Sequence, residues 1–208
     1  MDWITHGWQY FLRGGLLMWP LLACSVASLT IVLERLAYYR KADSGRMFSR
    51  KFCSLLQLGK RKEAFELASR TPGETAALGK ILLSAPVQAV TKDSYIQGEC
   101  LQVLNRLEKG LPYLSVIVTL APILGLMGTI TGMMASFQAL GTRWENPLAV
   151  TAGVAEAMIT TIFGLAIAIF TICFHTYFSH KVKQQSLEME QLANTILENT
   201  GLEEGGRP

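Results

Sequence analysis

The sequence predicts an all-α membrane protein with three transmembrane helices and long cytoplasmic helical extensions. Only 17% of its 208 residues are charged, against roughly 25% in an ordinary soluble domain. Three long stretches carry almost no charge: 14–33, 111–142 and 146–179. Each is long enough for a helix to cross a bilayer, which takes about 20 apolar residues. The rest of the chain has helical patterning without the alternation that predicts strands.

The basic residues orient these spans. Eleven Lys and Arg residues flank the spans on the side of the long central loop and the C-terminus, and two flank the other side. Because cytoplasmic loops carry an excess of Lys and Arg, the loop and the C-terminus are expected in the cytoplasm. The net charge of +3 therefore reflects topology and does not indicate nucleic-acid binding.

The first residues predict an interfacial helix, because Trp3, Trp8 and Phe11 fall on one face and aromatic rings favour headgroup depth. The predicted segments are an N-terminal interfacial helix on the outer side (1–13), transmembrane helix 1 (14–34), a cytoplasmic helical region (35–110), transmembrane helix 2 (111–141), an outer loop (142–147), transmembrane helix 3 (148–179), and a cytoplasmic C-terminal helix and tail (180–208).

The cytoplasmic region predicts several short helices. Helix-forming residues with helical apolar spacing occur over 61–70, 75–85 and 95–111. Thr71 is expected to cap the second of these helices, with Pro72 in its first turn.

The second span carries a stripe of small or polar residues. They recur at intervals of three and four, which places them on one narrow helical face: Pro122, Gly125, Thr129, Gly132 and Ser136. Gly128 and Gly132 also form a GxxxG pair, a weak motif for close helix packing. The stripe alone fits either helix packing or a pore wall.

The third span also carries small and polar residues on one face, together with the only charged residue of this span. A wide arc of one face carries Gly153, Glu156, Thr160, Thr161 and Gly164. A carboxylate facing acyl chains costs several kcal/mol, about 2.5–3.5 on insertion scales, so Glu156 should face a bundle interior, water or a partner. It could also lie near the outer headgroups, because Pro147 can take the first position of this helix and Glu156 follows within three turns. Geometry alone leaves both interpretations open.

Enzymatic signatures are absent from the sequence. It has no phosphate-binding GxxxxGK[ST] loop, no HExxH and no GxSxG. The four widely spaced cysteines and three histidines offer no zinc spacing, so no metal or cofactor is expected. No second carboxylate lies in the stretches 14–33, 111–142 and 146–179, and if protons move here another chain should supply the other titrating group.

Two segments, "TLAPILGLMGTITGMMASF" (119–137) and "GVAEAMITTIFGLAIAI" (153–169), resemble the MotA/TolQ/ExbB proton-channel family. The ExbB and TolQ branch is most similar in layout, with three spans, an outer N-terminus and one large cytoplasmic loop. The first span fits more loosely, and residues 45–100 match only in helical character.

The resemblance implies a homopentamer in the bacterial inner membrane whose second and third spans line a central lumen. Two single-span partner subunits of the ExbD or TolR type are expected inside, each with a proton-exchanging aspartate. Proton flow would then drive a TonB- or TolA-like protein that spans the periplasm. The lumen residues of the family fall on Thr129, Glu156 and Thr161, while Thr160 departs from the usual small apolar residue.

Two alternatives remain. A non-conducting scaffold of the same fold would keep the glycine stripe without needing Glu156 or Thr161. A small-solute transporter should show inverted repeats or broken helices, which the sequence lacks.

Overall fold

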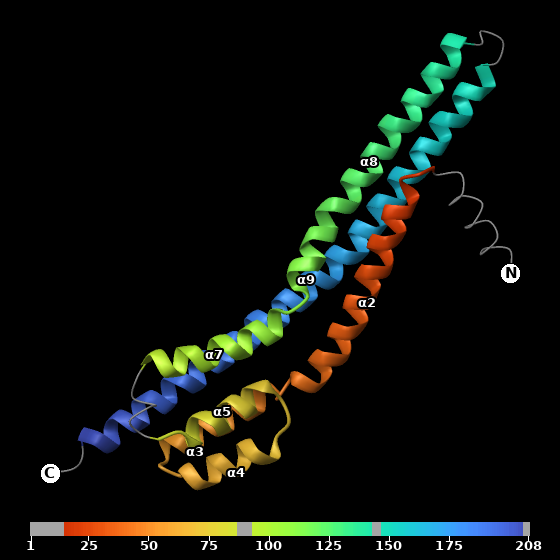
Figure 1. Cartoon of the computed structure of the whole chain (residues 1–208). Coiled ribbons are helices and arrows are strands. Elements are labelled where there is room, and N and C mark those ends of the chain that lie inside the picture. Colours follow the sequence, from red (N-terminus) through yellow and green to blue (C-terminus); the bar gives the residue numbers. More distant parts are fainter. Residues whose placement is uncertain (1–14, 87–92, 143–146, 206–208) are drawn as a thin grey trace, which may run out of the picture. The chain divides into compact units, whose positions relative to one another are not determined.

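The computed structural model describes residues 15–86, 93–142 and 147–205, and its regular elements in these ranges are helices (Figure 1). They are α2 (Met18–Ala42), α3 (Arg46–Gln57), α4 (Arg61–Arg70), α5 (Glu74–Ser84), α7 (Asp93–Glu108), α8 (Leu111–Thr142) and α9 (Pro147–Gly205). The predicted interfacial helix at 1–13 and most of the predicted outer loop lie outside the described residues.

The chain divides into two units. The first, called the span unit, comprises residues 1–33 and 110–176. The second, called the bundle unit, comprises residues 34–109 and 177–208. Both α2 and α9 contribute residues to each unit.

Three helical stretches in the described chain are long and apolar enough to cross a membrane. They fall within Met18–Gln57, Ser94–Gln138 and Gly153–Asn199. This confirms the predicted all-helical membrane fold with three candidate spans. The exact span limits stay a prediction, although α8 covers the second span and α9 begins at Pro147 as expected.

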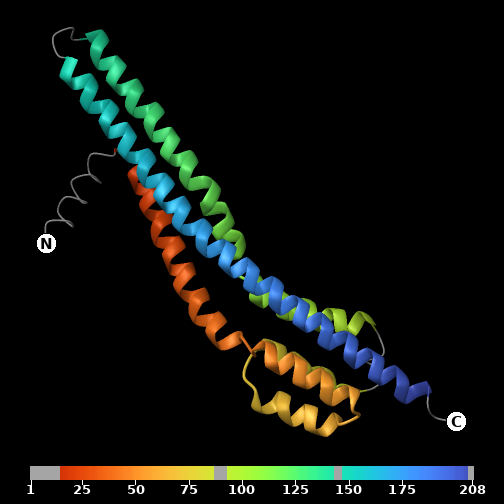
Figure 2. The same ribbon diagram turned by 180° about the vertical axis from the view of Figure 1, so that it is seen from behind.

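In the span unit, α8 and the first part of α9 run side by side, as both views show (Figures 1 and 2). The first turns of α2 join them through a small apolar core. Met18 and Leu21 of α2 and Ala121 of α8 are almost fully buried there. Leu124 and Ile167 pack against this core.

The bundle unit has a core of large apolar side chains from α3, α5, α7 and α9. Its fully buried members include Phe52, Leu78, Leu82, Leu107, Phe178, Met189, Leu192 and Ile196. Gly79 lets α5 approach its neighbours, because a methyl group added there would lie 3.1 Å from the Phe52 ring and 3.5 Å from Leu192.

Side chains from α2 cap the C-terminal end of α7. Arg35 donates a hydrogen bond to the carbonyl of Arg106 (3.3 Å), and the Tyr39 hydroxyl donates to the carbonyl of Leu107 (2.6 Å). These carbonyls have no partner within their own helix, since the last turn of any helix leaves its carbonyls unpaired. Burial raises the pKa of Tyr39 to about 12, so its hydroxyl keeps its proton at physiological pH. Between α7 and α8 the chain turns at Gly110, whose φ of 91° suits glycine.

The predicted start of α5 is wrong. Thr71 ends α4 instead, where its hydroxyl donates to the carbonyl of Leu67 (2.8 Å). The helix begins at Glu74 after Gly73 (φ 122°), and the Ala76 N–H donates to the hydroxyl of Ser44 (3.2 Å). The cap therefore comes from a residue 32 positions away in the sequence, which local patterning cannot reveal.

Candidate functional site

The backbones of α8 and α9 meet closely at two glycines. A methyl group added at Gly125 would lie 3.1 Å from the Cα of Thr161 and 3.4 Å from the Cα of Gly164. One added at Gly164 would lie 2.6 Å from the carbonyl oxygen of Ala121. A Cβ atom at such distances would push the two backbones apart, so glycine is what allows this approach.

The close contact continues toward the end of α8. A methyl group at Gly128 would lie 2.5 Å from the Thr160 side chain, and one at Gly132 would lie 2.8 Å from the Cβ of Ala157. Further along, Gly153 lies against the Ser136 side chain. The glycines Gly125, Gly128, Gly132, Gly153 and Gly164 and their contacts define one surface, called the α8–α9 seam. The seam explains most of the predicted stripe as helix packing within one chain.

Thr161 links the two helices through its hydroxyl. The hydroxyl donates a hydrogen bond to the carbonyl of Gly125 across the seam (2.8 Å). In an apolar environment, an unpaired hydroxyl is costly to bury, and this bond satisfies its donor. The Thr161 oxygen keeps acceptor capacity, and the half-buried side chain is held in one place.

Thr129 follows Gly125 by one helical turn, at the edge of the seam. It is half-buried, and its hydroxyl donates to the carbonyl of Leu126 in its own helix (2.7 Å). Thr161 and Thr129 therefore lie within one turn of the same level. Pro122, one turn before Gly125, is also half-buried inside α8.

Thr160 and Ser136 are placed differently. Thr160 is 1% exposed and fills the space opposite Gly128. Ser136 is 5% exposed and donates to the carbonyl of Gly132 (2.8 Å). Both side chains belong to the seam of the single chain, and a lumen role for Thr160 stays a prediction.

Glu156 lies in α9 between two seam residues, Gly153 and Ala157. Its side chain is outside the described part of the structure. The choice between an outer headgroup position and a lumen position therefore stays a prediction.

A cavity of about 340 Å³ opens beside the seam, and sequence reasoning did not identify it. Its walls include Thr131 and Thr160 together with Gly128, Gly132 and the residues just before α2. The Thr131 hydroxyl donates to the carbonyl of Met127 in its own helix (2.9 Å). The sequence places Thr131 three residues after Gly128, and this spacing puts both residues on the same side of the helix.

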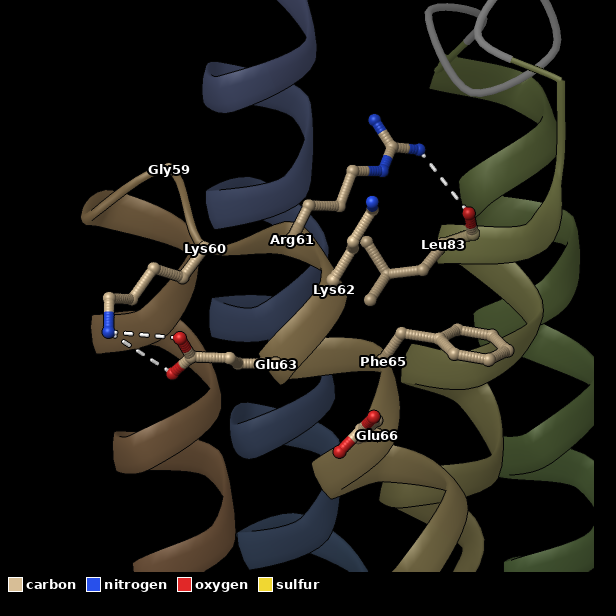
Figure 3. A pocket seen from close by; sticks show the side chains of 8 residues that line it. All are labelled: Gly59, Lys60, Arg61, Lys62, Glu63, Phe65, Glu66 and Leu83. Atoms are coloured by element: carbon tan, nitrogen blue, oxygen red, sulfur yellow. Dashed lines mark hydrogen bonds and ion pairs between the residues drawn. The ribbon is translucent and has the colours of Figure 1, made fainter.

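The bundle unit has an open pocket of about 740 Å³ around the start of α4 (Figure 3). Lys60 pairs there with Glu63 (3.0 Å), and Arg61 donates to the carbonyl of Leu83 (3.3 Å). The pocket carries charges of both signs, and Glu66 pairs with Arg70 outside the pocket (3.7 Å). Among the described residues, no group of His, Cys, Asp and Glu side chains could hold a metal ion.

The fold and the seam define a multi-pass membrane protein built on a tightly packed pair of apolar helices. Residues 76–191 match the MotA/TolQ/ExbB proton channel family. The chain is 30% identical to a putative biopolymer transport protein, ExbB-like 3, of Synechocystis over 91% of this chain and 90% of that protein. It is 29% identical to the Tol-Pal system protein TolQ of Pseudomonas aeruginosa over 79% and 77% of the two chains. Biopolymer transport protein ExbB of Salmonella typhimurium is 32% identical over 43% of this chain and 37% of its own.

The chain therefore belongs to the MotA/TolQ/ExbB proton channel family, as the two apolar motifs predicted. Proteins of this family are channel components, which confirms the expectation that the chain is not an enzyme.

The seam predicts a specific sensitivity to one methyl group. Gly128→Ala should lower the unfolding free energy by about 1–3 kcal/mol, the usual cost of overpacking, because the new Cβ meets the Thr160 side chain. The measurement is thermal unfolding of the detergent-solubilised protein. Gly98→Ala is the matched control, since its Cβ would meet nothing within 4 Å and alanine favours helix by up to about 1 kcal/mol.

Adding Thr160→Ala to Gly128→Ala should restore much of the lost stability, because it removes the colliding atoms. Equal effects of Gly128→Ala and Gly98→Ala, or no recovery in the double variant, would contradict the seam.

Proposed function

We propose that this chain is the ring-forming channel subunit of a machine that converts the proton motive force into mechanical work. Five copies surround a lumen in the bacterial inner membrane, lined by α8 and the first part of α9. Two single-span subunits of the ExbD or TolR type lie inside the ring. Their motion acts on a TonB- or TolA-like protein in the periplasm. The names of the relatives, biopolymer transport protein and Tol-Pal system protein, support this assignment.

The observation that carries the proposal is the pair of hydroxyls on neighbouring helices. Thr161 bonds the carbonyl of Gly125, and Thr129 follows one turn later on α8. In a long uncharged environment, these groups offer fixed hydrogen-bonding positions without adding charge. A pathway for protons needs such groups, because a protonated carboxyl in an apolar wall requires an acceptor for its O–H.

The proposed mechanism uses these hydroxyls as partners for the carboxyl group of the inner subunit. The protonated carboxyl is neutral and donates its O–H to the acceptor oxygens of Thr129 and Thr161, whereas the carboxylate, which only accepts hydrogen bonds, is solvated by water. Threonine does not titrate, so Thr129 and Thr161 position the carboxyl and the proton travels on the partner. Glu156, near the outer end of α9, adds an acidic ring at the proton entrance.

The orientation belongs to the same proposal. The N-terminus and the loop between α8 and α9 face the periplasm, and the bundle unit faces the cytoplasm. The excess of Lys and Arg around the bundle unit supports this orientation.

Thr129→Val tests the hydroxyl directly, because valine keeps the volume and removes the hydrogen-bonding oxygen. We expect proton-driven function to fall at least about tenfold, because a hydrogen bond to an ionisable group contributes about 1.5–3 kcal/mol, while the complex still assembles. The readout is proton uptake into vesicles that contain the chain with its partner. Thr119→Val is the matched control: its hydroxyl also donates to a carbonyl of its own helix (2.9 Å), on the side of α8 away from the seam. Equal activity of both variants would remove Thr129 from the pathway.

Glu156→Gln separates the two positions that the sequence left open. In a lumen the variant removes one acidic ring at nearly constant shape, and proton uptake should drop several-fold with normal protein levels. In the headgroup zone it should change little, because exposed charges contribute at most about 1 kcal/mol. Full activity of both Glu156→Gln and Glu156→Leu would favour the non-conducting scaffold.

A further inference from the structure

The bundle unit has an apolar groove between α7 and α9. Its volume is about 320 Å³, and its walls carry Ile96, Cys100, Leu101 and Leu104 from α7 with Met189 and Leu197 from α9. Leu101 is 57% exposed, so an apolar side chain on the wall remains open to a partner. In water, such a surface gains free energy when another apolar surface covers it.

All charges along this groove are negative. The stretches 96–104 and 186–197 contain Glu99, Glu188 and Glu190 and no Lys or Arg. Glu188 already accepts hydrogen bonds from Ser49 and Gln184. In the described chain, Glu99 and Glu190 have neither a hydrogen bond nor an ion pair.

The same negative charges affect the pKa of the Cys100 thiol, which lines the groove. Burial in the groove raises its pKa, and the charges of Glu99 and Glu190 raise it further. The groove therefore combines an apolar floor with an acidic rim.

A complementary surface lies on α3 of the same unit. The buried side of α3 carries Phe48, Phe52 and Leu56. The opposite side is exposed and carries Met47, Arg50, Lys51, Ser54 and, just after the helix, Leu58. Met47 and Leu58 are 70% and 71% exposed, and α3 contains no acidic residue. This surface, called the α3 outer face, is apolar and basic.

We propose that the α3 outer face of one copy docks into the α7–α9 groove of the next copy in the ring. The charge signs are opposite, and each surface offers exposed apolar side chains to the other. Within one copy, α3 cannot turn this face inward, because Phe52 is fully buried against Gly79 and the Ser49 hydroxyl bonds Glu188 (3.4 Å). The inference rests on the proposed ring and names the contact that closes it.

The contact joins two different surfaces, so it is heterologous. Repeated around an axis, a heterologous contact closes into a ring when its rotation closes, and otherwise extends into an open filament. A two-fold contact would instead stop at a dimer. This difference makes the proposal testable by counting linked copies.

The test is disulfide crosslinking of the full-length chain between Ser54→Cys and the native Cys100, with the other three cysteines replaced by serine. Oxidation is carried out at about pH 9, because the pKa of Cys100 is raised and the thiolate is the reactive form. We expect a ladder of linked species that extends beyond the dimer to the full ring. Ser69→Cys is the matched control, because Ser69 is also an exposed serine but lies on α4, and it should not produce the ladder. Cys100→Ser should abolish it.

Charge reversal tests the electrostatic part. Lys51→Glu or Glu190→Lys alone should lower the crosslinking yield by about two- to fivefold, the range of an exposed ion pair. The two together should restore it. Single reversals without effect, or a double variant as poor as each single one, would overturn the assigned pairing.

Native mass spectrometry separates this inference from the ring itself. An intact ring without the crosslink would overturn the docking contact and leave the proposed function standing, whereas the absence of any ring would contradict the proposed assembly. Crosslinking that stops at dimers would also overturn the heterologous contact. If anionic lipid in reconstituted vesicles shields Ser54→Cys from maleimide and no ladder forms, the α3 outer face binds lipid, and the proposal is wrong.

Discussion

The close approach of α8 and α9 at Gly125 and Gly164 is the constraint on which the span unit depends. Each glycine removes the Cβ that would otherwise keep the backbones apart. Lipid tails are as apolar as leucine, so burial alone does not hold two helices together in a bilayer. Dispersion contacts and interhelical hydrogen bonds must do so, and both need short distances. The bond from Thr161 to the Gly125 carbonyl exists because the backbones come this close.

The same constraint links packing to the proposed chemistry. A seam made of glycines fixes the rotation of each helix about its own axis, which sets where the flanking hydroxyls lie. Thr129 and Thr161 occupy the edge of the seam, whereas Thr160 and Ser136 are buried inside it. The bundle unit uses a different principle. There, the burial of large apolar side chains and the capping of α7 by Arg35 and Tyr39 stabilise the packing of the helices.

Much of the fold could be predicted because membrane insertion leaves a strong signal in composition. Uncharged stretches and the excess of basic residues determine the predicted spans and their orientation. The glycine stripe was visible, but periodicity cannot tell a packing face from a pore wall, and the structure assigns Gly125, Gly128 and Gly132 to packing. The start of α5 was wrong because its cap, Ser44, is supplied from a distant turn. Glu156 and the pathway role of Thr129 stay predictions, since they concern surfaces that a partner would complete.

The seam can be measured directly by disulfide formation between Gly132→Cys and Ala157→Cys in a chain whose native cysteines are replaced. A Cβ at Gly132 would lie 2.8 Å from that of Ala157, and a small shift brings the pair to the ~3.5–4.5 Å that a disulfide spans. Oxidation should link α8 to α9 within one chain, which peptide mass spectrometry identifies while the denatured protein stays monomeric. Free thiols, or links only between different chains, would contradict the register on which the candidate pathway depends.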